Sequence, residues 1–129
     1  ITGGDDIFPE RALEPLARQR LLQDGDEVIG RAPDIIIDSW CGKRFRPQAV
    51  ATRSGWQEIP AVRHGRLYEI KSPIILQPGP AALTDGVTEI ARIIRAWADA
   101  SRKWASRKAM RLLRHKCSSN WNAANSKRP

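Results

Sequence analysis

The segment Ser39–Lys43 reads Ser-Trp-Cys-Gly-Lys and directly follows an apolar run that ends at Ile37 and Asp38. An aromatic ring, a thiol, a glycine and an ammonium group in five successive positions suit contact with a ligand. Packing of Trp40 and Cys41 beneath a neighbouring helix is the alternative interpretation, because cysteine is among the most buried residue types. Which of the two applies depends on the elements that position the segment.

Catalytic and metal-binding patterns are absent from the sequence. His64 and His115 are the only histidines, and neither has an acid or a nucleophile beside it at a recognisable spacing. Cys41 and Cys117 have no second cysteine or histidine at a metal-ligand spacing, and two free thiols are favoured over a disulfide between them. We therefore expect neither an enzyme nor a resident metal or cofactor.

The order of elements predicts an α/β fold, a three-layer sandwich around a short, mainly parallel sheet. The strands are expected at Ile35–Ile37, a continuous β-branched run, and at Arg66–Ile70. Short helices are expected at Glu27–Ala32, which Pro33 would end, and at Pro47–Thr52. A longer helix is expected over about residues 80–98, with an apolar stripe formed by Leu83, Val87, Ile90, Ile94 and Trp97.

Two segments follow the predicted strands in the same direction. Ser39–Phe45 follows the first strand, and Lys71–Pro80, with three prolines and one glycine, follows the second and is expected to be a loop. In parallel sheets ligands bind beyond the carboxyl ends of the strands, so both segments should meet at the ligand edge.

Charge divides the chain in two. Residues 1–98 hold thirteen basic and thirteen acidic residues, whereas residues 99–129 hold nine basic residues and only Asp99, which accounts for the net charge of +8. This asymmetry predicts a domain over residues 1–98 and a basic extension over residues 99–129, helical at first and then disordered.

Residues 1–98 resemble the carboxyl-terminal lobe of the substrate-binding proteins of ABC importers that carry cobalamin and iron chelates, most closely the cobalamin branch. The similarity runs through Gly3–Phe8, Asp26–Ile29, Arg31–Lys43, Arg53–Ile70, Ser72–Gly86 and the closing helix up to Ala98, with "SWCGK" and "LQPGPA" as its most distinctive pieces. It implies a periplasmic or other extracytoplasmic protein whose two lobes clamp a ligand. This chain would be the second lobe, and an amino-terminal lobe would precede Ile1, which is not a methionine.

The resemblance also implies a ligand, the residues that contact it and a partner. A corrinoid, cobalamin, is the expected ligand, and an iron siderophore or haem is the alternative. The residues that would face it by this likeness are Phe8, Trp40, Cys41, Gly42, Lys43, Ser72 and Gln77. Aromatic area suits a flat apolar ring, Ser72 and Gln77 suit its amide arms, and Gly42 admits close backbone approach. Cys41 could approach a metal in the ligand, but a packed thiol is favoured.

Family members dock on the permease subunits through one acidic side chain per lobe. The likeness places that acid at Asp26, seven residues before Pro33, where the usual residue is glutamate and where the adjacent Glu27 can share the role. Capping of the following helix by Asp24 or Asp26 is the alternative interpretation. The two roles are compatible.

The basic extension offers a different function, binding of nucleic acid or of an anionic membrane. Lys103, Arg107, Arg111 and Arg114 can share one helical face. A solvated basic extension is the favoured interpretation because no binding motif accompanies the charge, and nucleic acid is not an expected partner.

Overall fold

The computed structural model describes the backbone of residues 2–125 and the side chains of residues 2–108 and 110. The chain divides into two compact units, Ile1–Ala91 and Arg92–Pro129. The first unit holds both strands and all the elements around them, so it carries the predicted ligand edge. The boundary predicted between residues 98 and 99 from charge stays a prediction.

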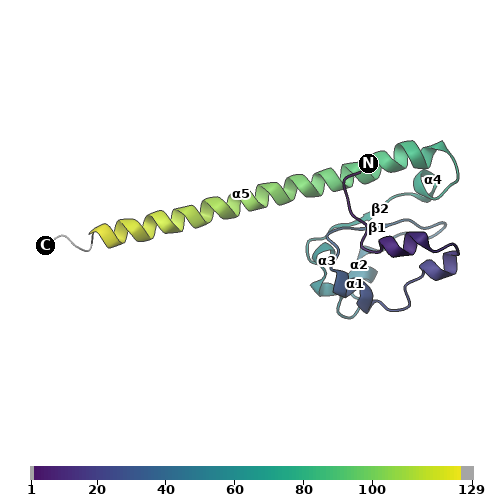
Figure 1. The fold of residues 1–129 in the computed structure, drawn as a ribbon, viewed down its shortest axis with the longest axis horizontal. Helices are drawn as coiled ribbons and strands as arrows, with labels where there is room; N and C mark the ends of the chain where they lie inside the picture. Colours follow the sequence, from purple (N-terminus) through teal and green to yellow (C-terminus); the bar gives the residue numbers. More distant parts are fainter. Residues whose placement is uncertain (1, 126–129) are drawn as a thin grey trace. The chain divides into compact units, whose positions relative to one another are not determined.

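The first unit is built on a short parallel sheet, which confirms the predicted α/β class. Strand β1 (Ile36–Asp38) pairs with β2 (Leu67–Glu69) in a two-stranded sheet of the described chain, with Ile36 opposite Leu67 and Asp38 opposite Glu69 (Figure 1). Both strands lie within one residue or two of the predicted runs. Because the strands are parallel and in register, the segments that follow them leave from the same edge, as predicted.

Short helices surround the strands. The α-helices of this unit are α1 (Asp26–Arg31), α2 (Pro47–Ala51), α3 (Pro60–Arg63) and α4 (Ser72–Ile75). Two 3₁₀ turns, η1 (Pro9–Leu13) and η2 (Ala17–Arg20), precede α1, and a third, η3 (Trp56–Glu58), lies between α2 and α3. Proline occupies the first turn of α2, α3 and α4, where its missing N–H costs no intrahelical hydrogen bond. The two short helices predicted from the sequence are confirmed to within a residue at each end.

The core of the first unit lies between α1, η3 and α3. Val28, Trp56, Ile59 and Ala61 form its buried cluster, and Ile59 and Ala61 are almost fully buried. Hydrogen bonds tie this cluster to the strands: Ala61 N donates to Pro33 O at 2.9 Å, and its carbonyl accepts from Arg66 N at 2.7 Å. The backbone of Ala61 therefore holds the segments that precede both strands.

Two predictions for the segment after β2 are wrong. Lys71–Pro80 is not a loop throughout, because Pro73 opens the single helical turn α4 instead of preventing it. Leu83, expected on a buried stripe, is 79% exposed. It lies in the π-helical turn η4 (Ala82–Gly86), whose wider repeat shifts the register that the 3.6-residue spacing assumed. Gly86 and Ala91 take buried positions instead.

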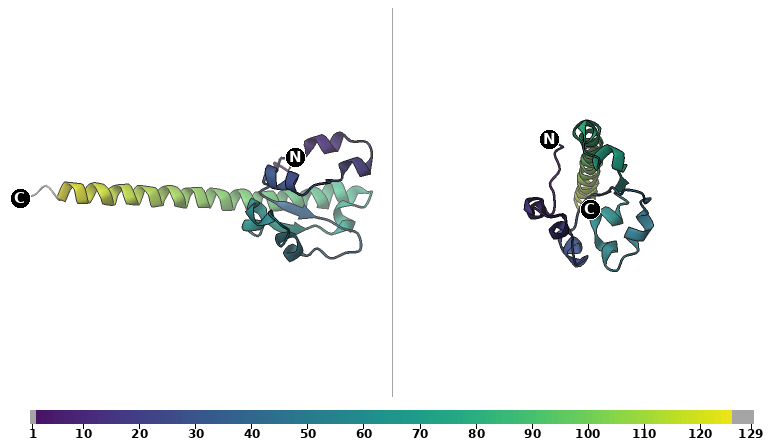
Figure 2. Two further views of the ribbon diagram at one scale, coloured as in Figure 1. Left: turned by 90° about the horizontal axis from the view of Figure 1, so that it is seen from below. Right: turned by 90° about the vertical axis from the view of Figure 1, so that its right-hand side faces the viewer.

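Helix α5 (Val87–Asn125) continues through residue 98 into the basic extension, which was predicted to be helical at first (Figure 2). The disorder predicted for the end of the extension stays a prediction, and residues 126–129 lie outside the described residues. Of its described side chains beyond Ser101, those of residues 102–108 and 110 are exposed. In the described part of the chain no helix combines the length and the apolar character that crossing a membrane requires.

Candidate functional site

The carboxyl ends of β1 and β2 place two candidate segments side by side. Asp38 and Glu69 are register partners at this edge, and Ile70 N donates to Asp38 O at 2.9 Å, which extends the strand contact by one residue. Directly beyond it, Ser39–Phe45 follows β1 and α4 follows β2. The sequence prediction of a shared edge thus holds at the level of the backbone.

Trp40 is exposed at this edge. Its side chain is 58% accessible, so packing beneath a neighbouring helix, the alternative considered from the sequence, is wrong. Lys43 Nζ lies 5.4 Å from the centroid of the Trp40 ring, a cation–π distance. Gly42 connects the two with φ of +81°, a conformation that glycine adopts without strain. The glycine therefore turns the chain so that the ammonium group returns over the ring.

Cys41 is a free, exposed thiol. The packed thiol favoured from the sequence is therefore wrong. Among the described residues, no group of three or more histidine, cysteine or acidic side chains could hold a metal ion, so the thiol is not part of a preformed metal site there. Cys117 lies outside the residues whose side chains the structure describes.

Ser72 and Gln77 lie on and just after α4. Ser72 is half-buried and its carbonyl accepts a hydrogen bond from Leu76 N at 2.9 Å, whereas Gln77 is exposed beyond the end of the turn. The helical turn thus separates the two residues that the resemblance put on one loop. Their contacts with a ligand stay a prediction.

Phe8 lies apart from Trp40 in the surface of this unit. The ring packs against the buried core cluster, and the guanidinium carbon of Arg31 lies 4.3 Å from its centroid. Phe8 lines a shallow hollow with Arg11 and Leu22, whereas Trp40 and Lys43 line a different one. Trp40 and Lys43 therefore lie together in the structure, and Phe8 lies at a different hollow.

The hollow at Trp40 contains residues that the sequence prediction left out. Its lining is Asp38, Trp40, Lys43, Arg44, Phe45, Arg46, Ala49, Val50 and Arg53. The run Lys43–Arg46, with three basic residues in four positions directly after a strand end, was the available signal. Arg53 follows α2 and could be placed there only once the path of that helix was known.

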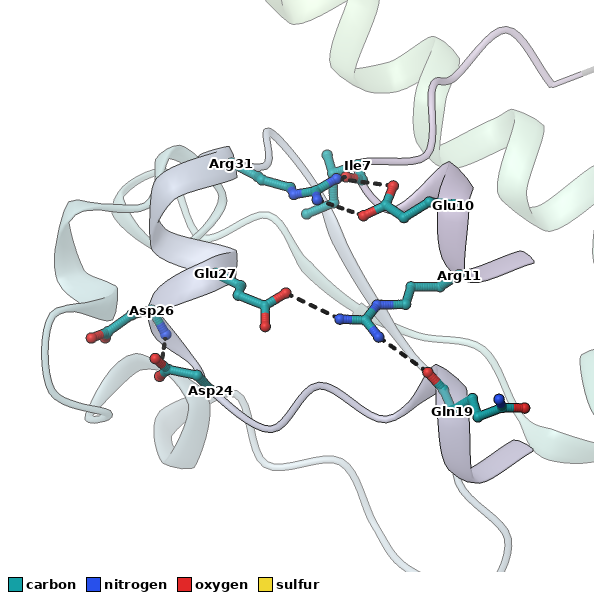
Figure 3. Close-up of polar contacts among 8 residues, drawn as sticks. All are labelled: Ile7, Glu10, Arg11, Gln19, Asp24, Asp26, Glu27 and Arg31. Carbon is teal, nitrogen blue, oxygen red and sulfur yellow. Dashed lines mark hydrogen bonds and ion pairs between the residues drawn. The ribbon is translucent and has the colours of Figure 1, made fainter. Parts of the chain in front are cut away.

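The two acids predicted for docking differ in their surroundings (Figure 3). Glu27 Oε2 lies 3.3 Å from Arg11 Nη2, and Arg11 also donates to Gln19 O at 3.1 Å. Asp26 is exposed, and in Figure 3 its carboxylate points away from both side chains. Its backbone N–H donates to Asp24 Oδ1 at 2.9 Å, so the Asp24 carboxylate, one position before the N-cap residue Gly25, binds the first N–H of α1, and the Asp26 carboxylate does not cap the helix.

A second arginine ties the amino-terminal segment to the other end of α1. Arg31 donates to Ile7 O and pairs with Glu10, with 2.5 Å between Nη2 and Oε1 (Figure 3). The hydrogen bond and charge of Arg31 hold the pKa of Glu10 below its ordinary value of 4.5. At the ligand edge, the hydrogen bond from Lys71 similarly lowers the pKa of Glu69, with Arg44 adding a smaller attraction. Both carboxylates are thus ionised at neutral pH.

Comparison with known proteins places this arrangement in a family. A family model described as periplasmic binding protein matches residues 1–74. The chain is 32% identical over 101 residues to the uncharacterized ABC transporter substrate-binding lipoprotein YvrC of Bacillus subtilis (strain 168), and the match covers 72% of this chain and 31% of that protein. The chain therefore spans about a third of the curated relative it matches. No solved structure matches it.

These matches agree with the resemblance read from the sequence at the level of the family, and that family consists of binding proteins, in line with the prediction of a protein that is not an enzyme. The matched residues include both strands, the Trp40 segment and the first turn after β2. Since they make up more than half of the sequence, the chain belongs to the periplasmic binding protein family.

Proposed function

We propose that this chain is one lobe of the substrate-binding component of an ABC importer and that it binds a corrinoid, cobalamin, between itself and an amino-terminal lobe. The family membership and the printed name of the B. subtilis relative support the transport role. They equally support a location outside the cytoplasmic membrane, in the periplasm or another extracytoplasmic space.

The exposed ring of Trp40 at the carboxyl ends of β1 and β2 carries this proposal. A tryptophan left more than half accessible at the edge where parallel sheets bind ligands offers apolar area to a flat macrocycle. Ser72 and Gln77, on the segment after the neighbouring strand, are within the same unit and can donate to or accept from amide arms. Haem or an iron siderophore is the alternative ligand of the same surface.

Asp26 is the proposed contact with the permease. It is exposed and no ion pair or hydrogen bond of its carboxylate occurs among the described residues, whereas Glu27 is already paired with Arg11. An unpaired surface carboxylate is free to meet an arginine of a partner and to steer the encounter. The structure thus favours Asp26 over Glu27 for the role that the sequence assigned to both.

A second candidate function belongs to α5. Lys103 and Arg107 line one hollow of this helix with Arg102, and Lys108 Nζ lies 4.9 Å from the ring of the exposed Trp104. This combination of cations and an aromatic ring suits an anionic membrane or a nucleic acid. Such binding would fall steeply with added salt, whereas packing of a macrocycle on Trp40 would persist.

The test is a titration of the isotope-labelled 129-residue chain, followed by amide and indole NMR signals. Cyanocobalamin should shift the indole N–H of Trp40 and the amides of Gly42 and Gln77, while the indole of Trp104 stays in place. A single lobe buries only part of a ligand that good sites cover by about 70–90%, so weak, fast-exchange binding is expected.

Two comparison ligands decide the ligand class. Shifts at Trp40 with a gallium-loaded siderophore or zinc protoporphyrin, and none with cyanocobalamin, would assign an iron chelate or haem instead. Shifts confined to Trp104, and abolished by salt, would move the function to α5. The absence of any shift at Trp40 with all three ligands contradicts the proposal.

A further inference from the structure

The hollow beside Trp40 is strongly basic. Four of its lining side chains are cationic, Lys43, Arg44, Arg46 and Arg53, and a single carboxylate, Asp38, lies among them. Its lining therefore carries a formal charge of +3, although the first 98 residues as a whole are neutral. The charge is concentrated at this one place on the ligand edge.

Among the described residues none of these four cations takes part in an ion pair, whereas other basic side chains of the unit, such as Arg11, Arg31 and Arg66, do. The acid at the neighbouring strand end, Glu69, is hydrogen-bonded to Lys71 and attracts Arg44 less strongly. Lys43 lies over Trp40, and Arg53 lies 4.6 Å from the centroid of Trp56. An aromatic face holds a cation in position without cancelling its charge.

Like charges in one hollow repel each other, and an anion that enters relieves the repulsion and gains charge-assisted hydrogen bonds. Three of the four cations are arginines, whose planar donors match carboxylate and phosphate oxygens in pairs. The carboxylate of Asp38, which also lines the hollow, disfavours an anion placed beside it at the end of β1. The oxyanion should therefore lie toward Arg46 and Arg53 while the rest of the ligand reaches Trp40.

From this we infer that the hollow binds an oxyanion substituent, a phosphodiester or a carboxylate, of the ring ligand that packs on Trp40. This inference rests on the proposed function and narrows its ligand class. A corrinoid qualifies when it carries the phosphodiester of its nucleotide loop, and a porphyrin qualifies through its propionates. A macrocycle without an oxyanion group does not.

Pairs of ligands with and without the oxyanion test this inference on the 129-residue chain by NMR titration. Zinc protoporphyrin is compared with its dimethyl ester, which differs only in the two carboxylates, and cyanocobalamin with dicyanocobinamide, which lacks the nucleotide loop and with it the phosphodiester. We expect the member that carries the oxyanion, in the pair that binds, to bind about fivefold more tightly, the effect of one exposed charge contact. Which pair responds identifies the source of the oxyanion.

Charge variants locate the contact. Arg46 is exposed and directly precedes α2 without a side-chain cap, so Arg46→Glu should leave the fold intact and abolish the preference for the member that carries the oxyanion, and Arg46→Gln should reduce that preference. Arg18→Glu is the matched control, because Arg18 is also exposed, lies on η2, and lines none of the hollows described above.

The outcomes separate this inference from the proposed function. If both members of a pair shift the Trp40 indole with equal affinity, or if Arg18→Glu weakens binding as much as Arg46→Glu, the oxyanion site is refuted while ring binding at Trp40 stands. If no ligand shifts Trp40, the proposed function fails and the inference fails with it.

Discussion

At the scale of single residues, Trp40 and Trp104 form a natural comparison. Both are exposed, at 58% and 60%, and both have a lysine ammonium above the ring, at 5.4 and 4.9 Å. They differ in location, since Trp40 lies two residues after the end of β1 and Trp104 lies on α5. We expect Trp40→Ala to weaken cobalamin binding by about 1–3 kcal/mol, the usual cost of losing an aromatic anchor. Trp104→Ala should leave it unchanged, as measured by isothermal calorimetry.

Asp26 and Glu27 provide a second residue-scale prediction. Asp26→Ala should slow uptake by a cell that carries the cognate permease, because it removes an unpaired surface acid. Glu27→Ala should instead lower the free energy of unfolding by about 0.2–1 kcal/mol, the value of a partly exposed ion pair with Arg11. Ligand affinity should be unchanged in both variants. Equal uptake by the Asp26 variant and the parent would exclude this acid from docking.

The pairing of Glu10 with Arg31 makes stability depend on pH in a defined direction. Because Arg31 lowers the pKa of Glu10 below 4.5 in the folded chain, the pair stabilises the fold above that value and loses its contribution as pH falls through the lowered pKa. Urea unfolding of the parent and of Glu10→Gln should therefore differ at pH 7 and converge near pH 3. A constant difference at both values, or a similar pattern in Glu14→Gln, would contradict this origin.

At the scale of elements, the turn before η3 is the most constrained position. Gly55 has φ of +77°, and a Cβ there would lie 2.8 Å from Ile29 Cδ1, a flexible end that can move. The backbone conformation therefore sets the cost, and Gly55→Ala should destabilise the fold by about 1–2 kcal/mol. Gly30→Ala, in α1 with open space around the added carbon, should be neutral or stabilising by up to about 1 kcal/mol. Thermal unfolding of the two variants measures both effects.

Elements governed by local chemistry were predicted from the sequence, and those governed by packing were not. The isoleucine run, the prolines that open helices and the proline that ends α1 act within a few residues, so β1, α1 and α2 were found. Ala32 lies outside the helix, as Pro33 predicted, but in the left-handed region at φ of +46° and not in the extended region usual before a proline. The π-helical turn at Ala82–Gly86 carries no such local signal, and it displaced Leu83 to the surface.

The candidate site shows the same division. Trp40, Gly42 and Lys43 were named from one contiguous segment, because the end of a parallel strand is a local feature with a known consequence. Arg53 lies ten positions beyond Lys43, and its presence in the same hollow depends on the course of α2. Phe8 was grouped with Trp40 by resemblance alone, and the structure gives it a different hollow.

At the scale of the whole molecule, charge and fold are separable. Deleting residues 101–129 removes nine basic residues and changes the net charge from +8 to −1. Because the described side chains from residue 102 onward are exposed, we expect the midpoint of thermal unfolding to change by less than about 4 °C, as circular dichroism would show. A larger decrease would mean that the deleted segment contributes to the stability of the first unit. The deletion should also remove salt-sensitive binding to anionic vesicles.

The buried core cluster of the first unit lines neither the hollow at Phe8 nor the hollow at Trp40. Its residues are Val28, Trp56, Ile59 and Ala61. The side chains around Trp40 project instead from the segment after β1 and from α2, with accessible neighbours. Substitutions at Lys43, Arg44 and Arg46 can therefore change which ligand is bound without lowering the stability of the fold. For a protein engineer, these positions form a compact library whose members should remain folded while their ligand preferences diverge.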